Sequence, residues 1–258
     1  MTNSNIDETI KRYNPIIIIP ARMAATRLPG KPLAKIAGKE MILHVINRAK
    51  EAKIGKVLVA CGEEEIANVV NKEGETAILT DPNLPSGSDR IFAALETFDK
   101  EGKHKIIVNV QGDLPTIDPQ MIRDSLLPLE DEEVDIATLV AKTTTPEENA
   151  SPNVVKAVTA FAEGKRVARA LYFTRTTAPY GEGDIFHHIG LYAYRRASLA
   201  KFISLPQGIL EKREKLEQLR ALENGMRIDA TLVNKAPFGV DTKEDLDRAE
   251  IMIKQFLK

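Results

Sequence analysis

The sequence predicts an α/β fold of three layers, in which a mostly parallel, Rossmann-like sheet carries helices on both faces and antiparallel strands extend it in the second half. In the first half, short continuous apolar runs alternate with amphipathic helical patterns, as in parallel sheets. From Asp135 onward, apolar and polar residues alternate, as in antiparallel strands. A chain of 258 residues with 43% apolar and 28% charged residues is long and apolar enough to bury such a sheet.

The first half begins with a strand that is buried on both faces. Residues 15–20 form a β-branched apolar run bounded by prolines, which is typical of a central parallel strand. A long loop follows it, and apolar residues then recur at helical spacing from Met41. The remaining elements of this half are expected as a helix at 63–71, strands at 56–60, 76–80 and 105–110, and a helix opened by Ser88 or Asp89.

The second half is predicted to contain antiparallel strands with one solvated face. They are expected at 135–141, 154–160, 167–173 and 188–194, with a hairpin turn at Glu163-Gly164-Lys165. Helices are expected at 199–203 and 210–222, a strand at 227–233, and a last helix from Thr242, where Thr242 and Asp245 imitate a capping box.

The domain organisation predicted from these elements is simple. Residues 1–14 read as a polar N-terminal tail and residues 15–258 as a single domain, with 146–152 as the best loop between its halves.

Composition excludes several classes of protein. With 36 basic and 37 acidic residues, the net charge of −1 argues against a uniformly basic binder of nucleic acid or of anionic membranes. The early apolar run is too short to cross a bilayer, and the N-terminus lacks the apolar region of a secretory signal. The single cysteine, Cys61, cannot form an internal disulfide and is expected as a core thiol at a strand end. We therefore expect a cytoplasmic protein without membrane insertion.

One segment departs from this neutral balance. Residues 15–39 contain no acidic residue but carry five basic ones, Arg22, Arg27, Lys31, Lys35 and Lys39. The segment follows the first parallel strand, at the sheet edge where open α/β folds bind ligands. Guanidinium and ammonium groups there would suit a polyanion such as a triphosphate, although charge runs are more often solvated loops. We expect Lys35 and Lys39 to be surface charges, and Arg27 to be either a phosphate contact or a salt-bridge partner.

Two common phosphate motifs are absent from this loop. Gly30-Lys31 is followed by Pro32 instead of Ser or Thr, so it is not a Walker A loop. No Gly-x-Gly-x-x-Gly follows the first strand, which disfavours a nicotinamide dehydrogenase.

Two acidic residues are candidate metal ligands. Asp113 comes just after the strand at 105–110, and Mg²⁺ prefers hard oxygen ligands, of which one or two are usually carboxylates. Asp241 precedes the last helix. Each has an ordinary alternative, since Asp113 could belong to a Gly-Asp turn before Pro115 and Asp241 could cap the helix.

Seven motifs along the chain together resemble one family, the 3-deoxy-manno-octulosonate (Kdo) cytidylyltransferases or CMP-Kdo synthetases. The resemblance extends from Ile16 to about Ala249, and the order and spacing of the motifs make it specific. The motifs are Pro20-Ala21-Arg22 with Thr26-Arg27-Leu28-Pro29-Gly30-Lys31-Pro32-Leu33, Ser86-Gly87-Ser88-Asp89-Arg90, Asn109-Val110-Gln111-Gly112-Asp113, Tyr172-Phe173-Thr174-Arg175, His188-Ile189-Gly190-Leu191-Tyr192, Lys215-Leu216-Glu217-Gln218-Leu219-Arg220 and Gly239-Val240-Asp241-Thr242.

The resemblance implies an enzyme that joins CTP to Kdo, giving CMP-Kdo and diphosphate for lipopolysaccharide synthesis, with Mg²⁺ as cofactor. It also implies a homodimer, with residues 135–195 as the sugar-binding and dimerisation region. The implied catalytic residues are Lys31, Asp113 and Asp241, of which the two acids hold the metal. The implied nucleotide contacts are Ala21, Arg22, Lys31, Ser86, Gly87, Arg90 and Gln111, and the implied sugar contacts are Arg175, His188, Tyr192, Glu217 and Gln218.

Strand and helix geometry support part of this assignment. On a strand, His188 shares a face with Tyr192 whereas His187 points the other way, so His188 is the better candidate. A zinc site is discounted, because no cysteine or further histidine lies at ligand spacing. Tyr192 could equally be packed in the core, and Glu217 and Gln218, which flank the apolar stripe of the helix expected there, could be a solvated pair.

The chain departs from the commonest family pattern at three places. Leu114 stands where many members have Glu, Ser88-Asp89 where they have Thr-Glu, and Ala25 where they have Ser. The loss of charge at Leu114 puts a second acidic ligand in that loop in doubt. Two alternatives stay open: another CMP-sugar synthetase, acting on sialic acid or an amino-deoxy variant of Kdo, and a nucleotide-binding relative without turnover.

Overall fold

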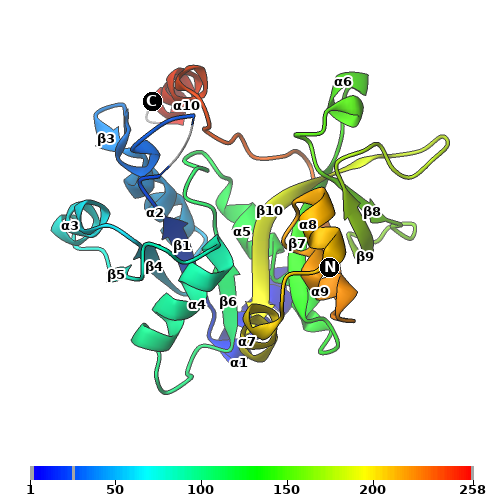
Figure 1. Cartoon of the computed structure of the whole chain (residues 1–258), viewed down its shortest axis with the longest axis horizontal. Helices are drawn as coiled ribbons and strands as arrows, with labels where there is room; N and C mark the ends of the chain where they lie inside the picture. Colours follow the sequence, from blue (N-terminus) through cyan, green and yellow to red (C-terminus); the bar gives the residue numbers. More distant parts are fainter. Residues whose placement is uncertain (1–2, 25–26, 257–258) are drawn as a thin grey trace. The chain divides into compact units, whose positions relative to one another are not determined.

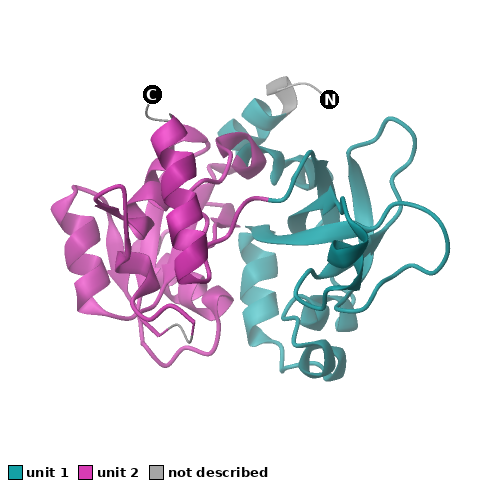
Figure 2. Ribbon diagram, turned by 90° about the horizontal axis from the view of Figure 1, so that it is seen from above, with its two compact units in different colours: residues 1–12, 123–236 teal, residues 13–122, 237–258 magenta. Residues whose placement is uncertain are grey.

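The computed structural model describes residues 3–24 and 27–256, and contacts within the chain divide it into two compact units (Figure 2). Unit 1 comprises Met1–Arg12 and Arg123–Ala236, and unit 2 comprises Tyr13–Ile122 and Pro237–Lys258. The sequence predicts a single domain from residue 15, with 146–152 as the loop between its halves. In the structure this loop lies inside unit 1, where it contains the short helix α6 (Pro146–Ala150).

Unit 2 contains the predicted parallel sheet, in the strand order β5-β4-β1-β6. Its strands are β1 (Ile16–Ala21), β4 (Lys56–Cys61), β5 (Ala77–Leu79) and β6 (Ile106–Asn109). All three pairings are parallel, with Ile16 opposite both Lys56 and Ile107. The first four residues of β1 are fully buried, as expected of a central strand. The α/β character predicted for this half is confirmed.

Unit 2 carries the longer helices α2 (Met41–Glu51), α3 (Glu64–Lys72), α4 (Gly87–Phe98) and α10 (Lys243–Phe256) (Figure 1), and each of them has buried apolar residues. Between β1 and α2 lie a short 3-10 helix, η1 (Lys31–Leu33), and a hairpin of β2 (Lys35–Ile36) and β3 (Lys39–Glu40). Cys61 is a buried free thiol at the last position of β4, as predicted, and burial raises its pKa to about 11.

The start of α4 differs from the prediction. Its N-cap is Ser86, two residues before the expected Ser88, and the Ser86 hydroxyl accepts a hydrogen bond from the Asp89 backbone N–H at 3.1 Å. Ser88 is instead buried inside the first turn of the helix. The cap at the last helix is confirmed: Asp245 N–H donates to the Thr242 hydroxyl at 3.2 Å, and Thr242 N–H donates to the Asp245 carboxylate at 3.1 Å.

Unit 1 contains a mixed sheet in the order β10-β7-β11-β9-β8. Its strands are β7 (Ile136–Lys142), β8 (Lys156–Thr159), β9 (Val167–Thr174), β10 (Phe186–Arg195) and β11 (Ile228–Val233). The β10–β7 and β8–β9 pairings are antiparallel as predicted, and β11, for which no direction was predicted, runs antiparallel to β9 and parallel to β7. The expectation of one solvated face is wrong for β7, because its first six residues are all buried.

Helices of unit 1 include α1 (Asn3–Tyr13), which lies in the segment expected as a polar tail. Ile6 and Thr9 are buried, and Asp7 forms an ion pair with Arg123 at 2.5 Å, so this helix is packed onto unit 1. The remaining helices are α5 (Pro119–Asp124), at the boundary of the units, η2 (Leu127–Glu130), α7 (Arg196–Ser204), α8 (Ile209–Glu214) and α9 (Leu219–Glu223).

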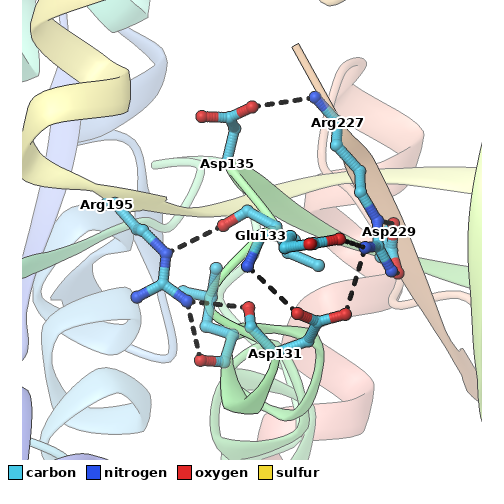
Figure 3. Close-up of polar contacts among 8 residues, drawn as sticks. Asp131, Glu133, Asp135, Arg195, Arg227 and Asp229 are labelled. Atoms are coloured by element: carbon cyan, nitrogen blue, oxygen red, sulfur yellow. Dashed lines mark hydrogen bonds and ion pairs between the residues drawn. The ribbon is translucent and has the colours of Figure 1, made fainter.

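A charged network fixes one end of the unit 1 sheet (Figure 3). Arg227 pairs with Asp229 at 2.9 Å and with Asp131 at 3.0 Å, and its backbone N–H donates to Asp135 at 2.9 Å. Arg195 donates to the backbone carbonyls of Val134, Leu129 and Asp131. Because these residues lie at the ends of β7, β10 and β11, the network holds the three strands in register.

Candidate functional site

The acid-free loop after β1 is tied into a compact turn. Gly30 adopts a left-handed φ of 71°, and its N–H donates to the Met23 carbonyl at 3.2 Å. Pro32 is buried at the start of η1, and Leu28 and Ala34 pack against an apolar cluster formed by β2, α2 and α10. These contacts fix the position from which the Lys31 side chain projects.

Lys31 is the centre of a small charged cluster. Its ammonium group lies 2.9 Å from Asp113 Oδ2, 3.1 Å from Asp241 Oδ1 and 3.0 Å from the Val240 carbonyl oxygen. An ammonium group has three protons, so each of these acceptors can receive one. Burial alone lowers the pKa of Lys31, but the two carboxylates outweigh that effect and raise its pKa above the ordinary value. The lysine is therefore held as a cation between two anions.

The two acids come from loops that are joined by their backbones. Val240 N–H donates to the Asp113 carbonyl at 3.0 Å, which fixes the loop after β6 beside the segment before α10. Gly112 lets the loop after β6 also lie close to β1, since a Cβ atom there would be 2.9 Å from the Pro20 carbonyl oxygen. The last helix is capped by Thr242 and Asp245, so Asp241 is free to point towards Lys31 and not to its own helix.

Arg27 also reaches this cluster. Its guanidinium lies 2.9 Å from Asp241 Oδ2, while the other oxygen of the same carboxylate contacts Lys31. Of the two possibilities left open by the sequence, the structure shows the salt bridge. Lys35, by contrast, is 67% exposed and lies 4.0 Å from Glu40.

A cavity of about 390 Å³ opens over the cluster, entirely within unit 2. It contains every residue that the sequence predicts for the nucleotide, the phosphates or the metal. These residues are Ala21, Arg22, Lys31, Ser86, Gly87, Arg90, Gln111, Asp113 and Asp241. The cavity is also lined by Arg27, which the sequence offered as either a phosphate contact or a salt-bridge partner, and by Leu84 and Pro85, which the motifs did not single out as contacts.

The first turn of α4 forms one wall of this cavity. Ser86 and Gly87 lie at its N-terminus, where backbone N–H groups and the helix dipole favour an anion. On the facing loop, Arg22 is exposed and makes no hydrogen bond or ion pair with any residue that the structure describes. Cationic and N–H donors thus surround a space in which no carboxylate except Asp113 and Asp241 is present among the described lining residues.

Arg90 and Gln111 have internal partners as well as a place in the lining. Arg90 is only 2% exposed, and it donates to Thr80 Oγ1 at 2.6 Å and to the carbonyls of Asp81 and Pro82 at 3.2 Å. Gln111 donates to Asn109 Oδ1 at 3.4 Å. Arg90 therefore shapes the wall of the cavity by holding the loop after β5.

The residues predicted for the sugar lie in unit 1. On β10, the His188 and Tyr192 ring centroids are 5.5 Å apart, so the two side chains share a face as expected. The strand is irregular between them, because Ile189 pairs with Leu139 and Tyr192 with the adjacent Thr138. β10 thus has two more residues than β7 at this point. Because side chains alternate between the faces of a strand, two extra residues keep the later side chains of β10 on their expected faces, whereas one would have reversed them. Burial lowers the pKa of His188 to about 3 and raises the pKa of Tyr192.

Glu217 and Gln218 lie in a turn, which corrects the single helix predicted at 210–222. Lys215 adopts a left-handed φ of 55° and ends α8, and α9 begins only at Leu219. Gln218 is 6% exposed, and its Nε2 has no hydrogen-bond partner among the described residues. A buried donor without a partner is costly, so this amide is suited to receive a ligand.

Arg175 already makes several contacts in this unit. Its guanidinium donates to the carbonyls of Glu214 at 2.7 Å, Pro152 at 3.0 Å and Lys215 at 3.2 Å. Five N–H donors are available, so some remain for a carboxylate. Lys156, which the sequence did not single out, is buried on β8 and donates to the carbonyls of Ser151 and Arg175. A lysine in a strand of alternating polarity is expected to face solvent, so the burial of Lys156 could not be predicted from the sequence.

Comparisons with known proteins agree with this geometry. Residues 16–228 match the Cytidylyltransferase family. The 3-deoxy-manno-octulosonate cytidylyltransferase of Paramagnetospirillum magneticum is 60% identical over 93% of this chain and 98% of its own. The enzyme of that name from Rhodospirillum rubrum is 59% identical over 93% of this chain and 95% of its own. A solved CMP:2-keto-3-deoxy-manno-octonic acid synthetase, complexed with CTP, is 35% identical and superposes with a TM-score of 0.85 over 94% of this chain and 99% of its own.

Proposed function

Because this chain belongs to the 3-deoxy-manno-octulosonate cytidylyltransferases, we propose that it transfers the cytidylyl group of CTP to Kdo and releases diphosphate. The product, CMP-Kdo, is the activated sugar for lipopolysaccharide synthesis. The observation that carries this proposal is the Lys31, Asp113 and Asp241 cluster in a cavity whose lining also includes the cations Arg22, Arg27 and Arg90 and the first turn of α4.

The reaction needs little covalent chemistry from the protein. The anomeric hydroxyl oxygen of Kdo forms a bond to the α-phosphorus of CTP, the bond from that phosphorus to the oxygen bridging the α- and β-phosphates breaks, and diphosphate leaves. The hydroxyl proton is released to solvent. Such phosphoryl transfers depend on positioning and on neutralising charge. In the cavity, Arg22, Lys31 and the first turn of α4 would bind the phosphates, and Gln111 would contact the nucleoside.

Asp113 and Asp241 fit a magnesium site. Their carboxylates are close enough for one ammonium group to contact both, and hard oxygen donors of this kind suit Mg²⁺. When bound, the metal would neutralise phosphate charge. No cluster of three or more His, Cys, Asp or Glu side chains suited to a metal occurs in residues 3–24 and 27–256, so substrate oxygens and water would complete the coordination. Leu114 is buried and offers no ligand.

The sugar acid would bind in unit 1 through Arg175, His188, Tyr192, Glu217 and Gln218. Gln218 supports this role through its unpartnered, buried Nε2, and Arg175 through its remaining N–H donors. A guanidinium is the natural partner of the Kdo carboxylate.

Three broader features are proposals as well. The contacts of both α2 and α4 with β1 and β4 support a three-layer, Rossmann-like arrangement in unit 2. The family resemblance is the ground for proposing a homodimer formed through the region 135–195, which sedimentation at assay concentration would test. In the described part of the chain, no helix has the length and apolarity that a membrane span requires. A single cysteine is compatible with our proposal of a cytoplasmic enzyme.

The test is an assay of purified protein with CTP, Mg²⁺ and Kdo, in which diphosphate release is followed. We expect release with Kdo and CTP, and little with sialic acid or other nucleoside triphosphates. Faster turnover of sialic acid or of an amino-deoxy Kdo would assign the chain to a related synthetase. CTP binding without diphosphate release would identify a non-catalytic relative.

A further inference from the structure

A single buried hydroxyl group connects β7 to the irregular part of β10. Thr138 is fully buried, and its Oγ1 lies 3.1 Å from His188 Nε2, 3.1 Å from the Ile189 carbonyl oxygen and 2.9 Å from the Leu191 carbonyl oxygen. The two carbonyls flank Gly190, within the stretch where β10 has two more residues than β7. The hydroxyl therefore serves both the bulge and the histidine ring.

The proton inventory of these groups decides the direction of each hydrogen bond. A threonine hydroxyl has one proton to donate and can accept two hydrogen bonds, whereas a carbonyl oxygen only accepts. If the Thr138 hydroxyl donated its hydrogen bond to the His188 ring, it could not also donate one to the carbonyl of Ile189 or Leu191. If it donates to Ile189 or Leu191, the ring nitrogen must carry a proton and donate to Oγ1. The second arrangement satisfies more groups in a buried site.

The ring is neutral and held in place. Burial is the main reason that the pKa of His188 falls to about 3, so the side chain carries one ring proton at neutral pH. The Phe173 ring packs against the His188 ring with centroids 4.7 Å apart, and the Tyr192 ring packs against it at 5.5 Å. The backbone N–H of His188 donates to the Val155 carbonyl at 2.8 Å. Among the described residues, Nδ1 has no hydrogen-bond partner.

We propose that Thr138 is a positioning residue that fixes His188 as the Nε2-protonated tautomer, so that Nδ1 accepts a hydrogen bond from a hydroxyl group of the sugar acid. The inference rests on the proposed place of His188 in the sugar site. An unprotonated Nδ1 repels a carboxylate oxygen, since both are acceptors. His188 would thus recognise a hydroxyl group of the sugar and leave the carboxylate to the guanidinium of Arg175.

The tautomer can be measured directly in the wild-type enzyme. Protein labelled with ¹⁵N at histidine is recorded by long-range ¹H–¹⁵N correlation, which distinguishes the two neutral tautomers, and His188→Phe identifies the signals of residue 188. We expect a single Nε2-protonated form in the wild type. A predominantly Nδ1-protonated ring, or a doubly protonated one at neutral pH, would overturn the proposal without any threonine variant having to fold.

Kinetics of matched variants test the consequence for the substrate. Thr138→Val removes the hydroxyl and should raise the KM for Kdo about tenfold, with kcat and the KM for CTP changed by less than about twofold. Thr138→Ser restores the hydroxyl and should remain near wild type. Thr231→Val is the control, because Thr231 lies on the neighbouring strand β11, is also fully buried, and donates a hydrogen bond to the Asp124 carbonyl.

Three kinetic results would count against the proposal. An unchanged KM for Kdo in Thr138→Val, or an equal rise in Thr231→Val, would show that the effect does not pass through His188. An unchanged KM in His188→Phe would remove His188 from the sugar site and so refute the hydroxyl contact, while diphosphate release by the wild type would still support the overall function. The ¹⁵N spectrum decides the tautomer separately.

Discussion

The ammonium group of Lys31 lies 2.9 Å from a carboxylate oxygen of Asp113, although the two residues are 82 positions apart in the sequence. The same ammonium contacts Asp241 at 3.1 Å. Lys31 thus occupies the position between the two carboxylates in which a bridging cation would lie. Binding of CTP with Mg²⁺ would exchange this lysine contact for a metal contact and make the ammonium available to the phosphates.

Lys31→Ala should lower kcat/KM for CTP by about 100-fold or more, because it removes a cation from the site of developing charge. Diphosphate release at varied CTP measures the effect. Lys35→Ala is the matched control, since Lys35 lies in the same loop but is 67% exposed and contacts only Glu40 among the described acidic residues, at 4.0 Å. Equal losses in the two variants would mean that the loop contributes general charge and that Lys31 has no specific contact.

Asp113→Asn should reduce turnover by about 100-fold or more while CTP binding largely survives, because the amide keeps the shape of the side chain but loses the charge that would hold Mg²⁺. Calorimetric titration with CTP separates binding from turnover. Asp118→Asn is the control, since Asp118 is an exposed acid of the same loop region that only caps backbone N–H groups. Near-normal turnover in Asp113→Asn would refute the metal role.

The convergence of the residues that line the cavity in unit 2 could be predicted from the sequence, because these residues follow parallel strands. The carboxyl ends of parallel strands meet at one edge, so the basic loop after β1 and Asp113 after β6 had to converge. The position of Asp241 was harder to predict, because an acid before a helix often caps that helix. Here Thr242 and Asp245 form the cap, and the hydrogen bond from the Val240 N–H to the Asp113 carbonyl holds the Asp241 segment beside the loop after β6. That distinction depends on tertiary contacts.

The part of the chain around Gln218 could not be predicted in the same way. The apolar spacing at 210–222 favours one helix, yet the chain turns at Lys215, where no glycine marks the left-handed conformation. The turn is stabilised by tertiary hydrogen bonds that the Glu214 carboxylate accepts from the Thr174 hydroxyl and from the Arg175 backbone N–H. Likewise, β7 is a central strand between β10 and β11 whose first six residues are all buried, and alternation alone gave no sign of that.

Gly112→Ala should lower both the stability and the activity of the enzyme, because the added Cβ would lie 2.9 Å from the Pro20 carbonyl oxygen, and backbone cannot easily move away. We expect a loss of about 1–3 kcal/mol in the free energy of unfolding, as for other overpacked sites. Urea denaturation measures it. Gly190→Ala is the control for stability, since its new methyl group would meet no described atom within 4 Å. Equal stability of both variants would contradict the close approach.

Glu211→Gln should destabilise the protein by about 3 kcal/mol, because it removes the nearer of the two carboxylates that pair with the buried Arg220 guanidinium, the other being that of Glu217 at 3.9 Å. The pair is joined by hydrogen bonds of 2.9 and 2.6 Å, and both side chains are 7% exposed. Lys243→Ala breaks an exposed i,i+4 pair with Asp247 and should change stability little. Since Arg220 follows the turn that holds Gln218, the KM for Kdo should also rise in Glu211→Gln.

His188 should make the enzyme less stable as the pH falls below 6.5. Its pKa is about 3 in the folded protein and 6.5 in its ordinary state, so between these values the unfolded chain binds a proton that the folded chain excludes. The free energy of unfolding should therefore fall by up to about 1.4 kcal/mol for each pH unit from this group alone. Stability above pH 6.5 should be insensitive to it.

The contribution of His188 can be isolated by comparison with His188→Gln, which cannot titrate. Urea denaturation at pH 7, 6 and 5 gives two curves, and we expect their difference to shrink or reverse as the pH falls. The neighbouring His187, whose pKa is also lowered by burial, is present in both proteins, so the difference between the curves reports the titration of His188 together with its electrostatic coupling to His187. Parallel curves would mean that the His188 ring accepts a proton in the folded state, which is incompatible with a neutral ring donating to Thr138.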